Sequence, residues 1–246
     1  MSLIAQPMSR RSAATIAVAC AFLWAGCGGD DEAPETAAKP PPPAATPANS
    51  LPGFQTPLES GTTYTTEQFQ PAVRITVPDD GEWTTEVGDT PEHFSVLTKR
   101  DFGQALLAVH RIARVYDPEK GGVEPGDAVP LTVGFAEWLT GHPHLETEEP
   151  QPVELLGRSG VQIDFATRSS PPRTPDQACG HAGDDCVPFF YDGLDTIAYG
   201  KQVKGRFIVV PLDDGEIVLE LYASPAAAFD HAVAVLRPLL ESLELA

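Results

Sequence analysis

A hairpin followed by a helix, near residues 206–243, most constrains how this chain can fold. Two apolar runs, 206–212 and 216–222, flank the turn sequence Asp213-Asp214-Gly215. An Asp-Gly pair between apolar runs is a strong signal for an antiparallel hairpin. Ser224 and Pro225 then predict a helix start, with serine as the N-cap and proline at the first helical position. One face of the predicted helix is apolar and contains Phe229, Ala232, Val233, Leu236, Leu240 and Leu243.

Other segments have the pattern of strands. Residues 73–77 alternate apolar and polar side chains and end at Pro78, which predicts a half-buried strand. The long apolar run 105–116 is rich in β-branched residues, which favours a strand over a helix. Residues 132–141 predict a short helix that ends at Gly141. Further strands are predicted at 93–97, 153–156 and 161–165, and an irregular excursion from 169 to about 199.

This order of elements predicts an α+β fold in which helices pack on an antiparallel sheet. A first strand that ends in Pro78 and is followed by Trp83, and a last hairpin that leads into a helix ending at residues 239–243, resemble a known pattern. The pattern is that of the PsbP-like or Mog-type α/β sandwich of exported bacterial lipoproteins. The resemblance implies an α/β/α sandwich over residues 62–245, and it implies protein binding or assembly rather than catalysis.

The N-terminal segment has the order of a secretory signal. Arg10 and Arg11 precede an apolar run, 13–25, that is too short to span a hydrocarbon core. Ala25 and Gly26 then lead into Cys27, and this arrangement resembles the bacterial lipoprotein signal. The resemblance implies that Cys27 is the lipid-attached first residue of the mature protein. An ordinary secretory signal cut after residue 25 or 26 is the alternative.

Three regions are predicted along the chain. Residues 1–26 are the predicted signal peptide, and residues 27–60 are a predicted tether that begins at the lipid-attachment cysteine. The proline-rich and alanine-rich stretch 33–47 lacks the apolar surface that a packed core requires, and its four consecutive prolines favour an extended spacer. Residues 61–246 are predicted to form a single extracytoplasmic domain.

The charge of the chain restricts its partners. The formal net charge is −19, from 35 acidic and 16 basic residues. A field of this sign repels phosphate backbones, so we expect no nucleic-acid partner. The predicted lipid is the contact with the membrane, on the extracytoplasmic side, and an envelope protein or a small ligand is the expected partner.

Cys179 and Cys186 flank a glycine-containing loop. In an oxidising compartment this pair is expected to form a disulfide. The alternative is a metal site made by Cys179, His181 and Cys186 with Asp184 or Asp185, but the paired C-x-x-C spacing of zinc sites is missing. We therefore predict no cofactor and no metal.

Two classes of function remain. The favoured interpretation is a binding module, in which the adjacent aromatic residues Phe189, Phe190 and Tyr191 anchor a partner. The alternative is an envelope hydrolase that uses carboxylates or a bound metal near the Cys179–Cys186 loop, with candidates His181, Asp184 and Asp185.

The remaining histidines are assigned no chemistry. His142 and His144 are expected to be exposed in the loop that follows the short helix. His110 and His231 lie in predicted secondary structure, where a hydrogen-bonded or a surface histidine is expected.

Overall fold

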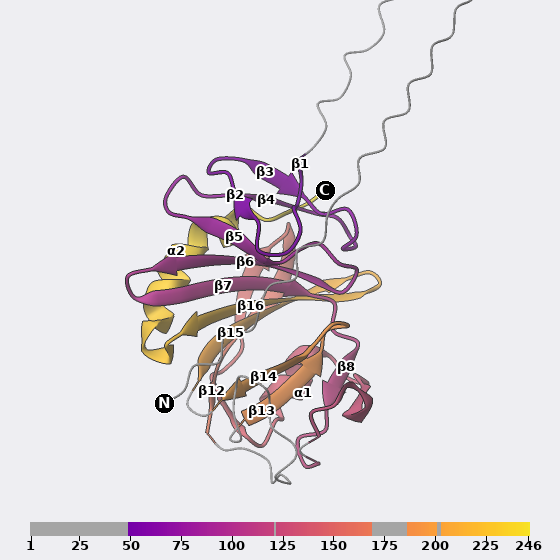
Figure 1. The fold of residues 1–246 in the computed structure, drawn as a ribbon. Coiled ribbons are helices and arrows are strands. Elements are labelled where there is room, and N and C mark those ends of the chain that lie inside the picture. The colour runs from indigo at the N-terminus through magenta and orange to yellow at the C-terminus, as the bar shows by residue number, and fades with distance from the viewer. Residues whose placement is uncertain (1–48, 121, 169–185, 201–202) are drawn as a thin grey trace, which may run out of the picture. The chain divides into compact units, whose positions relative to one another are not determined.

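A large antiparallel sheet forms the centre of the domain (Figure 1). The structure is a computed structural model, and it describes residues 49–120, 122–168, 186–200 and 203–246. All of them belong to one compact unit, Thr46–Ala246. None of the helices in these ranges is both long enough and apolar enough to cross a membrane.

The large sheet, called sheet B, has nine described strands in the order β10-β12-β15-β16-β7-β6-β5-β2, and β11 also pairs with β12. Every pairing in it is antiparallel. In chain order its strands are β2 (Pro57–Leu58), β5 (Trp83–Val87), β6 (His93–Arg100), β7 (Gly103–His110), β10 (Leu145–Thr147), β11 (Gln151–Leu155), β12 (Arg158–Thr167), β15 (Lys204–Leu212) and β16 (Gly215–Ser224).

Two smaller sheets accompany it. Sheet A has the order β1-β3-β4-β17, with a parallel pairing between β1 and β3. Its strands are β1 (Asn49–Ser50), β3 (Thr63–Thr65), β4 (Val73–Thr76) and β17 (Glu244–Leu245). Sheet C has the order β14-β13-β8-β9, and its strands are β8 (Arg114–Tyr116), β9 (Ala128–Pro130), β13 (Cys186–Tyr191) and β14 (Thr196–Gly200).

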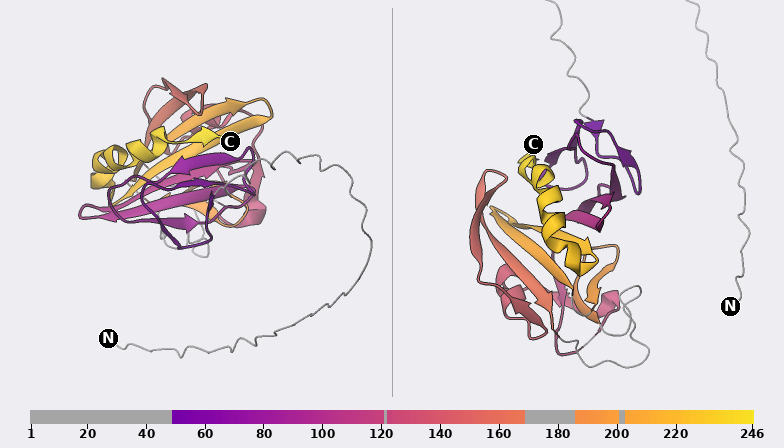
Figure 2. Two further views of the ribbon diagram at one scale, coloured as in Figure 1. Left: turned by 90° about the horizontal axis from the view of Figure 1, so that it is seen from above. Right: turned by 90° about the vertical axis from the view of Figure 1, so that its left-hand side faces the viewer.

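Sheet A and a helix cover one face of sheet B. Helix α2 (Phe229–Glu241) follows the short 3₁₀ helix η3 (Ala226–Ala228), so it begins four residues after the predicted start at Pro225. Its buried side chains pack with alternate residues of β15 and β16 and with apolar residues of sheet A. The second view in Figure 2 shows α2 lying along this face. This core includes Tyr64, Ile75, Trp83, Phe94, Ile208, Leu219, Phe229 and Leu236.

Sheet C and a short helix cover the other face of sheet B. The intervening residues of β15 and β16 point to this side, because successive side chains of a strand alternate between faces. They pack against β13, β14 and helix α1 (Phe135–Thr140); the 3₁₀ helix η1 (Pro125–Asp127) lies between β8 and β9. This core includes Phe135, Leu139, Phe165, Phe189, Phe190, Phe207, Val209 and Val218.

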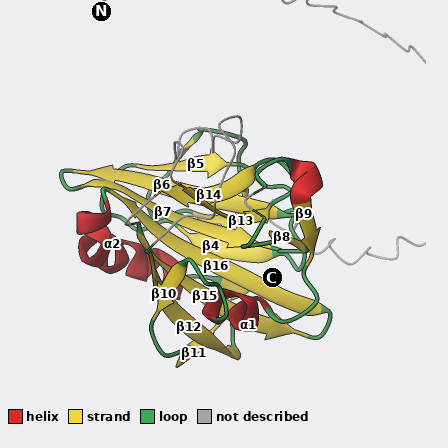
Figure 3. Ribbon diagram, turned by 90° about the horizontal axis from the view of Figure 1, so that it is seen from below, coloured by secondary structure: helices red, strands yellow, loops and turns green. Residues whose placement is uncertain are grey.

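The predicted α/β/α sandwich is wrong. Antiparallel strands dominate the described chain, which contains only the α-helices α1 and α2 (Figure 3). The helical layer expected on one side of the sheet is replaced by sheet C. Its strands β13 and β14 come from the part of the chain after residue 185 that was predicted to be irregular.

Several local predictions are confirmed. The hairpin of β15 and β16, the strands β4 and β6, and helix α1 lie where the pattern placed them. The run 105–116 is extended, but it is divided between β7 in sheet B and β8 in sheet C. The folded part also begins before the predicted boundary at Gly61, because Leu51 and Leu58 are buried in the core.

Candidate functional site

The three adjacent aromatic residues are not a surface patch. Phe189 and Phe190 are fully buried between sheets B and C, and Tyr191 is half-buried. The hydroxyl of Tyr191 donates a hydrogen bond to the carbonyl of Gly193 at 2.9 Å. Because sheet C covers the large sheet, the rings of Phe189 and Phe190 stabilise the core and are not accessible to a partner.

The cysteine loop is only partly described. Cys186 is fully buried at the start of β13. Cys27, Cys179, His181, Asp184 and Asp185 lie outside the described residues. The lipid attachment, the disulfide and the hydrolase candidates therefore stay predictions.

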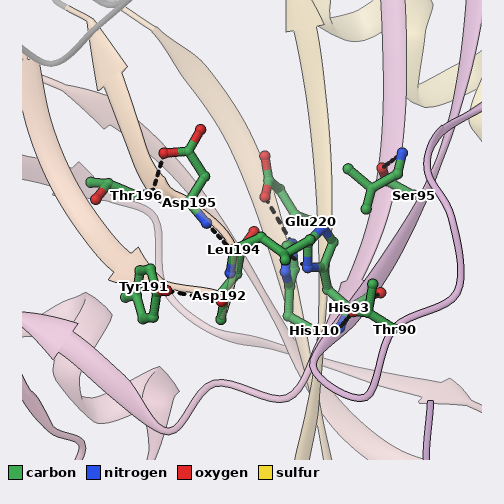
Figure 4. A network of polar contacts seen from close by, with 12 residues as sticks. Thr90, His93, Ser95, His110, Tyr191, Asp192, Leu194, Asp195, Thr196 and Glu220 are labelled. Atoms are coloured by element: carbon green, nitrogen blue, oxygen red, sulfur yellow. Dashed lines mark hydrogen bonds and ion pairs between the residues drawn. The ribbon is translucent and has the colours of Figure 1, made fainter. Parts of the chain in front are cut away.

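A group of polar side chains is buried between sheets B and C, and we call it the histidine cluster. It contains His93 from β6, His110 from β7, Glu220 from β16 and Asp192 directly after β13, which are labelled in Figure 4. Tyr199 from β14 completes it. Each is at most 6% exposed. None of the five residues was predicted from the sequence to carry chemistry.

The two histidines face each other because of strand register. His93 lies directly opposite His110 in the antiparallel pair of β6 and β7. Their rings are stacked with centroids 5.5 Å apart and an interplanar angle of 27°. Thr90 Oγ1 accepts the N–H of His93 at 3.0 Å and donates to its carbonyl at 2.7 Å, which holds the start of β6 in place.

Glu220 joins the two sheets. Its Oε2 lies 3.1 Å from Nε2 of His110, and its Oε1 accepts a short hydrogen bond from the hydroxyl of Tyr199. Burial raises the pKa of Tyr199 well above its ordinary value, and the nearby charge of Glu220 raises it further. The phenol therefore stays protonated and remains a donor at neutral pH.

Asp192 joins the loop after β13 to the cluster. Its Oδ1 accepts the N–H groups of Leu194 at 2.9 Å and Asp195 at 2.8 Å, which fixes a tight turn. Its Oδ2 lies 3.4 Å from Nδ1 of His93. Burial lowers the pKa of His93, and the charge of Asp192 partly opposes this effect.

The cluster has the residue types of a transition-metal site. His93, His110 and Asp192 each offer one ligand atom, and these atoms all lie within 4.8 Å of one another. The Nδ1 atoms of both imidazoles are buried and have no hydrogen-bond partner among the described residues. Neutral imidazole nitrogens and carboxylate oxygens are common ligands of Zn²⁺ and related ions.

His142 was expected to be exposed, but it is only 4% exposed. Its ring stacks on Phe189 at 5.9 Å and meets the edge of Trp138 at 5.0 Å. Its Nδ1 accepts the N–H of His144 at 3.3 Å. Burial, assisted by the neighbouring His144, lowers the pKa of His142 to about 4.

A surface hollow lies beside the loop that contains Asp192. It encloses about 600 Å³, and we call it the Phe54–Leu194 hollow. Phe54 is 65% exposed and Leu194 is 60% exposed, although both are large apolar residues. The charged residues that line it are all acidic: Glu67, Asp89 and Asp195.

Two members of the histidine cluster are recognisable in the sequence as polar residues within apolar strands. Glu220 interrupts an otherwise apolar strand, and His110 lies within the long apolar run 105–116. A charged residue inside a strand that is buried on both faces needs polar partners, so Glu220 indicates a buried polar cluster. His93 and Asp192 carry no comparable signal.

Searches of protein-family models, of curated proteins and of solved structures found no match to this chain.

Proposed function

We propose that this chain is a lipid-anchored binding module on the extracytoplasmic side of a bacterial membrane. The partner docks in the Phe54–Leu194 hollow, and it is a protein segment that presents an apolar side chain flanked by basic residues. The observation that carries the proposal is the pair of exposed apolar side chains in one hollow whose charged residues are all acidic.

The exposed apolar surface supports docking. Phe54 and Leu194 are two of the four large apolar residues that are exposed among the described ranges, and they lie far apart in the sequence. Buried Leu51 and half-buried Val87 extend the apolar lining between them. Large exposed apolar side chains that gather in one hollow are typical of interaction sites.

The acidic side chains define the chemistry of the partner. Glu67 and Asp195 carry negative charge at the hollow, and the chain as a whole has a net charge of −19. This field attracts a basic partner and repels an acidic one. Asp89 also holds in place the segment 67–69 at the edge of the hollow, because its carboxylate accepts the N–H groups of Glu67, Gln68 and Phe69.

Defined peptides test the docking surface. The probe is a fluorescein-labelled peptide with a central Leu-Phe pair flanked by lysines, and its matched control has glutamates instead. We expect the detergent-extracted full chain to bind the lysine peptide at least tenfold more tightly in a fluorescence anisotropy titration. The preference should weaken as salt is added, because salt screens exposed charges.

Substitutions locate the binding. Phe54→Ser and Leu194→Ser should each weaken binding of the lysine peptide by about tenfold or more, which corresponds to the loss of one buried apolar contact. Val133→Ser is the matched control, since Val133 is also exposed but lines a different hollow. Equal affinities for the two peptides, or equal losses in all three variants, would overturn the proposal.

A separate measurement tests the anchor. The intact mass of membrane-extracted protein should correspond to a chain that begins at Cys27 and carries a diacylglyceryl group. Reduction should add two hydrogens if Cys179 and Cys186 form a disulfide. A Cys27→Ser variant that stays in the membrane fraction would contradict the lipid anchor.

A further inference from the structure

We propose that the histidine cluster binds one divalent transition-metal ion, for which Zn²⁺ is the probe. His93, His110 and Asp192 are the protein ligands, and Glu220 is a positioning residue that holds the ring of His110. This site is separate from the docking surface, and it goes beyond the proposed function.

The contact with Glu220 fixes which nitrogen of His110 is free to bind metal. A carboxylate only accepts hydrogen bonds, so Nε2 of His110 donates to Oε2 of Glu220 across 3.1 Å. In a neutral ring this places the lone pair on Nδ1, which is buried without a hydrogen-bond partner in the described chain. A histidine that ligates metal ordinarily donates its other N–H to a carboxylate in this way.

His93 and Asp192 supply the other two ligand atoms. Nδ1 of His93 also lacks a hydrogen-bond partner among the described residues, and it lies 3.4 Å from Oδ2 of Asp192. Since Oδ1 of Asp192 is occupied by the N–H groups of Leu194 and Asp195, Oδ2 is the oxygen directed at the cluster.

The charge of the cluster favours a cation. Asp192 and Glu220 are at most 4% exposed, and neither forms an ion pair with lysine or arginine among the described residues. Their partners are two imidazoles, a phenol and main-chain N–H groups. Buried charges are stable only when they are paired or coordinate a metal, and a divalent ion compensates both carboxylates.

The distances require a small adjustment. Tetrahedral ligands of Zn²⁺ lie about 3.4 Å from one another. The three ligand atoms here are within 4.8 Å. Binding requires side-chain rotations that shorten the widest separation by up to about 1.4 Å, and three protein ligands leave a fourth position for water.

The ligand set selects the class of ion. Two imidazole nitrogens and one carboxylate oxygen suit Zn²⁺, Cu²⁺, Ni²⁺ or Fe²⁺. Ca²⁺ and Mg²⁺ prefer oxygen ligands in larger number. We therefore expect Zn²⁺ to bind stoichiometrically where excess Mg²⁺ does not compete.

Zinc titration of the full chain tests the site. The protein is treated with chelator and with iodoacetamide, which blocks free thiols, and is then titrated with Zn²⁺ in a calorimeter. We expect one ion per chain. Co²⁺ in place of Zn²⁺ should give the intense visible absorption of a low-symmetry site with nitrogen ligands.

Two substitutions distinguish the ligand His110 from the positioning residue Glu220. His110→Gln keeps an N–H near the position of Nε2 for Glu220 but removes Nδ1, so it should weaken Zn²⁺ binding at least 100-fold. Glu220→Gln should weaken Zn²⁺ binding about 10-fold to 100-fold, as do other substitutions of a residue that accepts a hydrogen bond from a metal-bound histidine. His142→Asn changes a buried histidine outside the cluster and should leave the affinity unchanged.

A near-isosteric variant serves as the control for correct folding. Asp192→Asn retains the shape of the side chain, and its circular dichroism spectrum establishes that it folds. We expect this variant to lose the Co²⁺ spectrum. The proposal is overturned if the wild-type chain binds no stoichiometric ion, or if folded His110→Gln and Asp192→Asn bind Zn²⁺ as tightly as the wild type.

Discussion

The hydroxyl of Tyr199 donates a hydrogen bond to the carboxylate of Glu220, and this contact connects two sheets through a mostly apolar interface. Tyr199 belongs to β14 of sheet C and Glu220 to β16 of sheet B. Phe165, Phe189 and Phe207 belong to the same interface. A polar contact in such surroundings fixes how the two layers lie on one another, because a displaced Glu220 would lose its partners.

Tyr199→Phe should lower the free energy of unfolding by about 1–3 kcal/mol, because it removes one hydrogen bond from a buried carboxylate. Urea denaturation followed by tryptophan fluorescence measures the change. Tyr222→Phe is the matched control, since Tyr222 packs against Tyr199 and its hydroxyl forms no hydrogen bond within the described ranges. Equal losses in both variants would contradict the role of the hydroxyl.

His142 should make the fold sensitive to acid. Its pKa is lowered to about 4 by burial, whereas an unfolded histidine titrates near 6.5. The unfolded chain therefore binds more protons between these values, so stability is highest above pH 6.5 and falls as the pH drops toward 4. The expected loss at this one residue is on the order of 3 kcal/mol.

A comparison of two variants isolates that effect from the titration of carboxylates. His142→Asn retains an acceptor near Nδ1 for the N–H of His144 and cannot be protonated. Its free energy of unfolding should depend less on pH between 6.5 and 4 than that of the wild type. His231→Asn, at an exposed position, should retain the wild-type dependence; an unchanged slope in His142→Asn would refute the prediction.

Phe190→Ala should cost about 3–5 kcal/mol of stability, as for other fully buried aromatic residues. Phe190 is 0% exposed, and its ring meets His110 at 4.9 Å and Phe135 at 5.9 Å. Thermal unfolding of this variant is compared with that of Phe54→Ala, which should differ little from wild type because Phe54 is 65% exposed. A loss below about 1 kcal/mol for Phe190→Ala would be inconsistent with its place in the core.

Gly205→Ala should destabilise the pair of β12 and β15 by about 1–3 kcal/mol. A Cβ at this position would lie 2.6 Å from the ring of Phe165, which is itself held between Phe189, Tyr199 and Phe207. The ring cannot move without disturbing its neighbours. Gly126→Ala meets no atom within 4 Å and should have little effect when both are measured by chemical denaturation.

The predictable parts of the fold depend on short-range signals. The turn at Asp213-Asp214-Gly215 and the Gly141 end of helix α1 are local features, and both elements occur as predicted. The division of 105–116 between two sheets has no local signal, because the apolar run continues through the break. Strands β13 and β14 of sheet C were missed because they fall in the stretch from residue 169 to about 199 that was predicted to be irregular. Pro188 of β13 lies next to a bulge, where the ladder can accommodate it.

The candidate site depends on long-range register. His110 and Glu220 are 110 residues apart in the chain, and they meet because β7 and β16 are neighbours. A sequence pattern defines which side chains share a face of one strand, but the partner strand and its register depend on the whole sheet. The sequence therefore predicts the strands that carry His110 and Glu220, but not that these two side chains meet.

Sheet A also has a consequence for the order of assembly. Its strand β4, at residues 73–76, pairs with β17, at residues 244–245, so the two partners are separated by most of the domain sequence. Closing so long a loop costs conformational entropy before any contact compensates for it, and pairings of this kind form slowly. A ribosome must therefore have made residue 245 before sheet A can be completed, and until then the β4 edge stays available to other strands.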